Sequence, residues 1–99
     1  MRVISESKLK QFWEIHSDAK NSLKTWYKIV KDAQWQNTAE VRETWNSVDF
    51  VQNFTVFNFK KKYRLIAYID YESGIVFIRN VLTHSEYDTN KWKEDEWFQ

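Results

Sequence analysis

The hydrophobic pattern of this chain changes its period once, near residue 55, and that change sets the class of fold. Before it, large apolar residues recur at the three- and four-residue spacing of a helix face. After it, β-branched and aromatic residues dominate, as they do in strands. The sequence predicts helices at residues 6–16, 18–33 and 37–45, strands at residues 55–59, 63–70 and 74–82, and an edge strand at residues 1–4. This order predicts an α+β fold, with N-terminal helices packed on a small antiparallel sheet and a short C-terminal helix.

Composition narrows the chemistry open to the chain. The 99 residues suit one domain, and 18 % aromatic residues can supply a dense core for so short a chain. There is no cysteine, no proline and only one glycine, Gly74. Disulfides, thiolate metal sites and glycine-rich phosphate loops are therefore excluded. No signal-peptide pattern occurs and no apolar run approaches the roughly 18 residues of a membrane span, so we expect a protein of the reducing cytoplasm.

Charge is divided unevenly along the chain, although the formal net charge is only +1. Residues 53–85 carry five basic and two acidic side chains, whereas residues 86–99 carry five acidic and two basic ones. The middle of the chain could form a local phosphate-binding surface. The acidic tail, which also contains Trp92 and Trp97, could fold near that surface and mask it.

The last two predicted strands are joined by a four-residue turn, residues 71–74, in which the glycine can adopt positive φ. If the turn sets Asp70 opposite Ile75, then Arg64 and Arg79 lie on one face as diagonal neighbours. The opposite face, nearly all apolar, would pack on the helices and consists of Tyr63, Leu65, Ala67, Ile69, Val76, Ile78, Asn80 and Leu82. Apolar residues also surround the arginines, which suits a concave surface where guanidinium groups bind phosphate.

The last strand leads to an imidazole and a phenol, His84 and Tyr87, near the run Lys60, Lys61 and Lys62. Histidine transfers protons near neutral pH, and tyrosine can do so where cations lower its pKa. Lysine and arginine hold a phosphate and stabilise the extra charge of a pentacovalent transition state. The set suits RNA cleavage in which a 2′-hydroxyl attacks the adjacent phosphate and a 5′-hydroxyl leaves. No set of metal ligands accompanies it.

Each of these residues also has a purely structural interpretation. Thr83 and Glu86 have the spacing of a capping box, which would make His84 a surface residue at the start of a short helix. Tyr87 could belong to the core, and the lysine run could be a solvated turn. His16 is interpreted as a helix-face residue rather than a catalyst, and the tryptophans at helical spacing as core.

The segment VFNFKKKYRLIAYIDYESGIVFIRNVLTHSEYD, residues 56–88, resembles the HigB family of bacterial toxins in the wider RelE-like group. The resemblance is carried by V-F-N, a basic stretch, Y-R-L-I, a hydrophobic hairpin, V-F-I-R and T-H-x-E-Y-D. The segments MRVIS and WYKIVKDAQW add to it. It implies a single compact α+β toxin domain over residues 1–99, which cleaves messenger RNA mostly on translating ribosomes of a bacterium, without a cofactor. It also implies a HigA-like helix-turn-helix antitoxin.

By position in this motif, Arg64 and Arg79 match the phosphate-binding arginines of RelE-like toxins. His84 and Tyr87 match the end of the motif, where a proton-transfer residue lies, and either could be the acid or the base. The residues expected to contact the RNA are Asn58, Lys60, Lys61 and Lys62. The nearly neutral charge and the acidic tail depart from the plainly basic character of many such toxins. The alternative is a non-catalytic module, or an inactive toxin-like protein, that binds RNA or an antitoxin.

Overall fold

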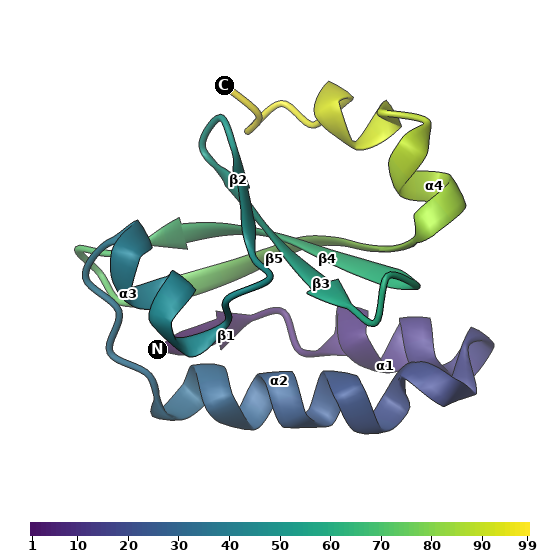
Figure 1. Cartoon of the computed structure of the whole chain (residues 1–99), viewed down its shortest axis with the longest axis horizontal. Coiled ribbons are helices and arrows are strands. Elements are labelled where there is room, and N and C mark those ends of the chain that lie inside the picture. The colour runs from purple at the N-terminus through teal and green to yellow at the C-terminus, as the bar shows by residue number, and fades with distance from the viewer.

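A computed structural model describes all residues, 1–99 (Figure 1). The helices are α1 (Ser7–Ile15), α2 (Lys20–Asp32), α3 (Thr38–Thr44) and α4 (His84–Asp88), with 3₁₀ turns η1 (Ser17–Ala19) and η2 (Lys91–Glu94). The strands are β1 (Arg2–Ile4), β2 (Asp49–Val51), β3 (Phe54–Phe59), β4 (Tyr63–Asp70) and β5 (Ile75–Thr83). Figure 1 shows α1 and α2 on one side of the sheet and α4 with the C-terminal segment on the other. The predicted α+β class is confirmed.

The five strands form one mixed sheet in the order β1-β5-β4-β3-β2. Strands β3 to β5 are antiparallel, as predicted, and β2 pairs antiparallel with β3. β1 runs parallel to β5, with Arg2 opposite Ile75. A parallel pair needs a long crossover, and all of the chain between these two strands supplies it. β1 is an edge strand, as its sequence predicted. The other edge strand, β2, was not predicted, because its residues Asp49–Val51 lie in a mixed polar and apolar connection.

Helices α1 and α2 bury the apolar stripes that their spacing predicted. α1 buries Leu9 and Phe12, and α2 buries Leu23, Trp26 and Val30. The turn η1 connects them into a helical hairpin. None of the helices combines the length and the apolar character that a transmembrane segment requires.

Two apolar clusters cover the two faces of the sheet. The larger cluster contains 17 buried residues and lies between the sheet and the helices. The second cluster contains Phe54, Val56, Ile66 and Trp92, against which pack Val51, Tyr68, Leu82, Tyr87, Trp97 and Phe98. We call the side of the sheet that carries it the second face. Both faces of the sheet are covered, so β3 and β4 are buried along most of their length. Their residues therefore do not simply alternate between buried and exposed.

The pairing of β4 with β5 confirms the predicted turn and corrects the register beyond it. The four-residue turn sets Asp70 opposite Ile75, as predicted. A β-bulge then interrupts the ladder between Ile66 and Ala67, and Arg79 is the residue left without a partner. A bulge places one extra residue on one strand. The predicted register is therefore wrong by one residue beyond this point.

The bulge changes which side chains of β5 face the helices. Arg64 lies opposite Leu82 instead of Val81. Leu82 accordingly packs on the second cluster and Val81 on the larger one, the reverse of the prediction. Asn80, also predicted to face the helices, lies opposite Ile66 of the second cluster. Side chains alternate along a strand, so one inserted residue exchanges the faces of all that follow.

Truncating a residue of the larger cluster tests how much that cluster stabilises the fold. Leu65 is fully buried, so Leu65→Ala leaves a cavity and should lower the free energy of unfolding by about 2–5 kcal/mol. Urea denaturation would show this as a lower midpoint at an unchanged m-value. The control Lys28→Ala, exposed on α2, should change stability by less than about 0.5 kcal/mol. Equal midpoints for the two variants would contradict the burial of Leu65.

Candidate functional site

The short helix α4 carries the two residues that the sequence singled out for proton transfer. Its capping box is present, as predicted: Thr83 Oγ1 accepts from the Glu86 N–H at 3.2 Å, and Glu86 Oε1 accepts from the Thr83 N–H at 2.9 Å. The His84 N–H donates to the Lys62 carbonyl oxygen at 2.9 Å. The cap and this bond tie α4 to the β3–β4 turn, and so fix His84 and Tyr87 relative to the lysine run.

His84 lies at a surface hollow of about 560 Å³ at one end of the sheet. The residues that line it are His16, Lys61, Lys62, Tyr63, Thr83, His84 and Ser85. His84 Nδ1 lies 3.1 Å from Asp88 Oδ2 on the same helix. His16 follows α1, and its ring stacks on Phe12 with centroids 4.5 Å apart. Both histidines of the chain therefore lie at one hollow, although His16 was interpreted as an ordinary helix-face residue. The only feature of the sequence that could have pointed to His16 is that the chain contains just two histidines, His16 and His84.

Arg64 and Tyr87 meet on the second face. Arg64 Cζ lies 5.5 Å from the centroid of the Tyr87 ring, which stacks on Trp92 at 5.1 Å. Burial raises the pKa of Tyr87 above its ordinary value. The charges of Asp49 and Asp88 raise the pKa further, whereas that of Arg64 lowers it. The effect of Arg64 is outweighed, so the net change raises the pKa of Tyr87, against the expectation that cations would lower it.

The three lysines of the β3–β4 turn have different surroundings. Lys60 and Lys61 adopt left-handed φ angles of 52° and 58°, and both are exposed. Lys62 pairs with Asp18, whose carboxylate also accepts from the Tyr63 hydroxyl at 2.6 Å. Hydrogen bonds from Lys62 and then from Tyr63 lower the pKa of Asp18. The charge of Lys62 is therefore partly satisfied within the chain, whereas Lys61 stands open to solvent.

Asn58, which was expected to contact RNA, is bonded within the chain. Its Nδ2 donates to the Ser47 carbonyl oxygen and, at 3.1 Å, to Asp49 Oδ2. These bonds hold the start of β2 against β3. Asn58 and Lys60 line a separate hollow of about 550 Å³ beside α2 and the end of α3. The residues expected to contact RNA are thus divided between two hollows and not gathered at one.

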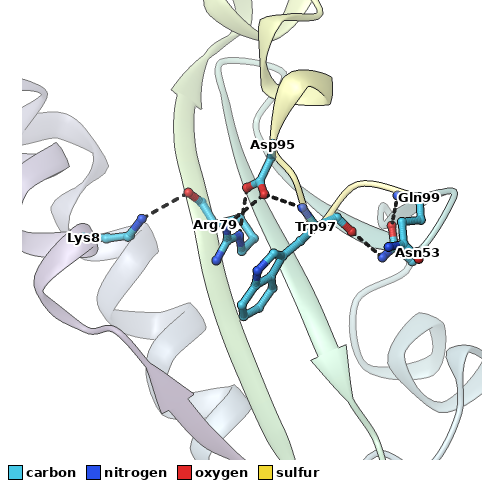
Figure 2. Close-up of polar contacts among 6 residues, drawn as sticks. All are labelled: Lys8, Asn53, Arg79, Asp95, Trp97 and Gln99. Atoms are coloured by element: carbon cyan, nitrogen blue, oxygen red, sulfur yellow. Dashed lines mark hydrogen bonds and ion pairs between the residues drawn. The ribbon is translucent and has the colours of Figure 1, made fainter.

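Arg79 lies apart from α4 and is held by the C-terminal segment (Figure 2). Its Nε and Nη2 donate to the two carboxylate oxygens of Asp95, each at 2.8 Å, and its Cζ lies 3.8 Å from the centroid of the Trp97 ring. Arg64 and Arg79 both contact residues packed on the second cluster, so they share a face as predicted. Leu82 is the residue opposite Arg64. Arg79 precedes Leu82 by three positions, so the two arginines are separated by roughly 10 Å along the strand direction. The structure does not gather Arg79 with the residues of α4.

Fold and site together define a small α+β protein whose arginine-bearing strand leads into a capped helix with a histidine and a tyrosine. A family model described as HigB_toxin, RelE-like toxic component of a toxin-antitoxin system, matches residues 19–90. The chain belongs to this HigB toxin family, as the resemblance in its sequence indicated. A search of curated proteins found no match. Membership implies an antitoxin partner, and residues 91–99 lie outside the match.

The ion pair between Arg79 and Asp95 predicts a pH-dependent stability. The hydrogen bond from Arg79 holds the pKa of Asp95 below its ordinary value of 3.8. In acid the unfolded state then binds more protons than the folded state, so this contribution is complete well above pH 3.8 and is lost as pH falls through the lowered pKa. Asp95→Asn should lower the free energy of unfolding by about 1–2 kcal/mol at pH 7, and by less as pH falls below about 5.

Urea denaturation between pH 3 and pH 7 measures this difference. Glu96→Gln makes the same charge change at an exposed neighbour, and surface changes of this kind alter stability by less than about 0.5 kcal/mol. If the loss of unfolding free energy in Asp95→Asn stayed constant over the whole pH range, the charge of the Asp95 carboxylate would not be what stabilises the folded state.

Proposed function

We propose that this toxin is a metal-independent endoribonuclease that cleaves messenger RNA, mostly on translating ribosomes in the bacterial cytoplasm. The 2′-hydroxyl attacks the adjacent phosphorus and the P–O5′ bond breaks, which leaves a 2′,3′-cyclic phosphate and a 5′-hydroxyl. Membership of a RelE-like toxin family supports RNA as the substrate class. The observation that carries the proposal is that one capped helix carries both His84, at the hollow that Lys61 also lines, and Tyr87, whose ring centroid lies 5.5 Å from Arg64 Cζ. The neutralising partner would be a HigA-like helix-turn-helix antitoxin.

This reaction needs a base at the 2′-hydroxyl and an acid at the 5′ oxygen. Imidazole accepts a proton near neutral pH, which suits His84 as the base. The carboxylate of Asp88, 3.1 Å from His84 Nδ1, would stabilise the imidazolium that forms. The candidate acid is Tyr87 because of its place beside Arg64, whose Cζ lies 5.5 Å from the Tyr87 ring centroid, although its raised pKa makes the phenol a weaker acid.

His16 offers a second imidazole at the same hollow and is the other candidate for the acid. Its ring is held between Phe12, at 4.5 Å, and Tyr63, at 5.6 Å between centroids. A residue fixed in this way can act only if the reacting phosphate enters the hollow instead of lying over Arg64. Replacing His16 and Tyr87 separately distinguishes the two arrangements.

The cations would hold successive phosphates of one RNA strand. Arg64 lies beside Tyr87, and Lys61 lines the hollow of His84; these two cations would stabilise the charge that develops at the scissile phosphate. Arg79, roughly 10 Å further along the sheet, would contact a neighbouring phosphate. Asn58 and Lys60, at the separate hollow, would contact the backbone beyond the cleaved bond.

A non-catalytic module that binds RNA or the antitoxin is the second candidate. It is favoured by the observation that three of the proposed RNA-contacting groups are already bonded within the chain: Asn58, Lys62 and Arg79. Such a module would bind RNA in a salt-sensitive manner and would create no new RNA ends.

Mapping RNA 5′ ends after induced expression in a bacterium tests the proposed activity. The wild type should create new 5′-hydroxyl ends inside translated frames. His84→Gln and Tyr87→Phe should each lower their frequency at least about 100-fold, since a general acid or base contributes about 10²–10⁴ in rate. Arg79→Ala should abolish toxicity through loss of a phosphate contact, and His16→Gln reports which residue is the acid.

Matched controls are Tyr27→Phe on α2 and Arg42→Ala on α3, which lie away from the site and should leave the new ends unchanged. Circular dichroism would establish that every variant is folded. Asp95→Asn removes the ion pair of Arg79. If neither the wild type nor this variant created new RNA ends, the binding module would be favoured. Unchanged ends for folded His84→Gln and Tyr87→Phe would refute the site and leave the activity standing.

A further inference from the structure

The last five residues, 95–99, lie across the second face, and we call them the C-terminal latch. Asp95 engages two donors of the Arg79 guanidinium, on Nε and Nη2, and the side chains of this pair are only 13 % and 23 % exposed. The Trp97 N–H donates to Asp95 Oδ1 at 2.8 Å, which orients the carboxylate (Figure 2). With the latch in place, the Nε–Nη2 edge of the guanidinium is occupied and cannot bind another anion in the same two-point manner.

Two cations from different elements face the Asp95 carboxylate. Arg79 belongs to β5 and Lys8 to α1, and Lys8 Nζ donates to the Arg79 carbonyl oxygen at 3.3 Å (Figure 2). After the hydrogen bond and charge of Arg79, the charge of Lys8 also lowers the pKa of Asp95. A guanidinium presents the same pair of N–H groups to a phosphate as to a carboxylate. The position of Asp95 therefore has the donors and the charge of a phosphate subsite.

Aromatic contacts and one asparagine hold the rest of the latch. The Trp97 ring packs edge-on against Tyr68 and Phe77, with centroids 5.7 Å and 5.3 Å away. Asn53, in the β2–β3 turn, donates from Nδ2 to the Trp97 carbonyl oxygen at 2.6 Å and accepts at Oδ1 from the Gln99 N–H at 2.9 Å. Trp97 thus covers two rings of the kind on which RNA bases stack.

The latch can be separated from the part of the tail that belongs to the core. Trp92 is 4 % exposed, and its Nε1 donates to the Tyr87 carbonyl oxygen at 3.0 Å. Trp97 is only half-buried, and the backbone leaves η2 through a bend at Asp95. The family match ends at residue 90, so the latch lies beyond the part of the chain that the family model describes. Phe98 also belongs to the latch, and its ring packs edge-on against Phe54 and Trp92, with centroids 5.4 Å and 5.5 Å away. Release of the latch would remove this contact and keep the hydrogen bond from Trp92 Nε1 to the Tyr87 carbonyl oxygen.

We propose that the C-terminal latch is an autoinhibitory segment, an inference that rests on the proposed function for RNA as the ligand. Asp95 holds the guanidinium of Arg79 in place of an RNA phosphate, and Trp97 covers Tyr68 and Phe77 in place of an RNA base. RNA binds across the second face only in molecules whose latch is open. The apparent Kd is then the intrinsic Kd divided by the open fraction.

Binding of an uncleavable probe measures this competition without any catalytic step. The probe is a fluorescein-labelled 2′-O-methyl RNA oligonucleotide, which lacks the attacking hydroxyl, and anisotropy gives its Kd for the full chain. Asp95→Asn should lower the Kd about tenfold, which corresponds to a latch closed in about nine of ten molecules. Glu96→Gln removes the same charge from an exposed neighbour and should change the Kd less than about twofold.

Two further variants separate release of Arg79 from a change in net charge. Trp97→Ala keeps the charge, removes the stacked ring and should also tighten binding. In the Arg79→Ala background, Asp95→Asn should change the Kd no more than Glu96→Gln does. Thermal unfolding followed by circular dichroism establishes that each variant is folded.

Equal Kd values for Asp95→Asn and Glu96→Gln would overturn the latch and leave Asp95 a structural partner of Arg79. A gain that persists without Arg79 would overturn it as well. Tighter binding by Asp95→Asn, with no RNA cleaved by any variant, would refute the ribonuclease and keep the latch. Cleavage by the wild type, with no gain in binding for Asp95→Asn, would refute the latch and keep the ribonuclease.

Discussion

β4 and β5 are paired from Asp70 opposite Ile75 beside the turn to Tyr63 opposite Thr83 beside α4, with one bulge at Arg79. Both faces of this pair are covered, one by the helices and the other by the C-terminal segment. Each face therefore has to receive the correct set of side chains, and a slip of one residue would move Arg64 into the apolar core. Burying an unpaired charge there would be strongly unfavourable. The pairing register is accordingly fixed by both faces at once.

The same pairing positions the candidate site. Thr83 is the last residue of the ladder and also the cap of α4, so the helix cannot shift without breaking the end of the sheet. The bond from the His84 N–H to the Lys62 carbonyl oxygen continues the connection for one more residue. An imidazole, a phenol and the lysine turn are thus held together by backbone geometry, and a rigid support of this kind is what a proton-transfer site needs.

Features encoded by neighbouring residues could be predicted from the sequence. The helix faces, the turn at Gly74 and the capping box at Thr83 depend on spacing within a few residues. Features made by distant segments could not be predicted. The parallel pairing of β1 with β5 leaves no local mark, and the bulge at Arg79 lies in an apolar strand that suits either register. His16 reaches the hollow of His84 only because the helical hairpin folds back under the sheet. The charge of the tail signalled that it could cover the basic face, but the two-point contact of Asp95 with Arg79 needed the three-dimensional structure.

Cleavage through the 2′-hydroxyl is tested most directly with a defined message on purified ribosomes, in conditions where the cut has been located with unmodified RNA. A second message would carry a single 2′-deoxy nucleotide on the 5′ side of that bond. We expect 5′-hydroxyl fragments from the unmodified message, and no cut at that bond in the 2′-deoxy message, because the attacking group is missing. Equal cutting of both messages, fragments with 5′-phosphate ends, or no cut in either message would contradict the proposed reaction.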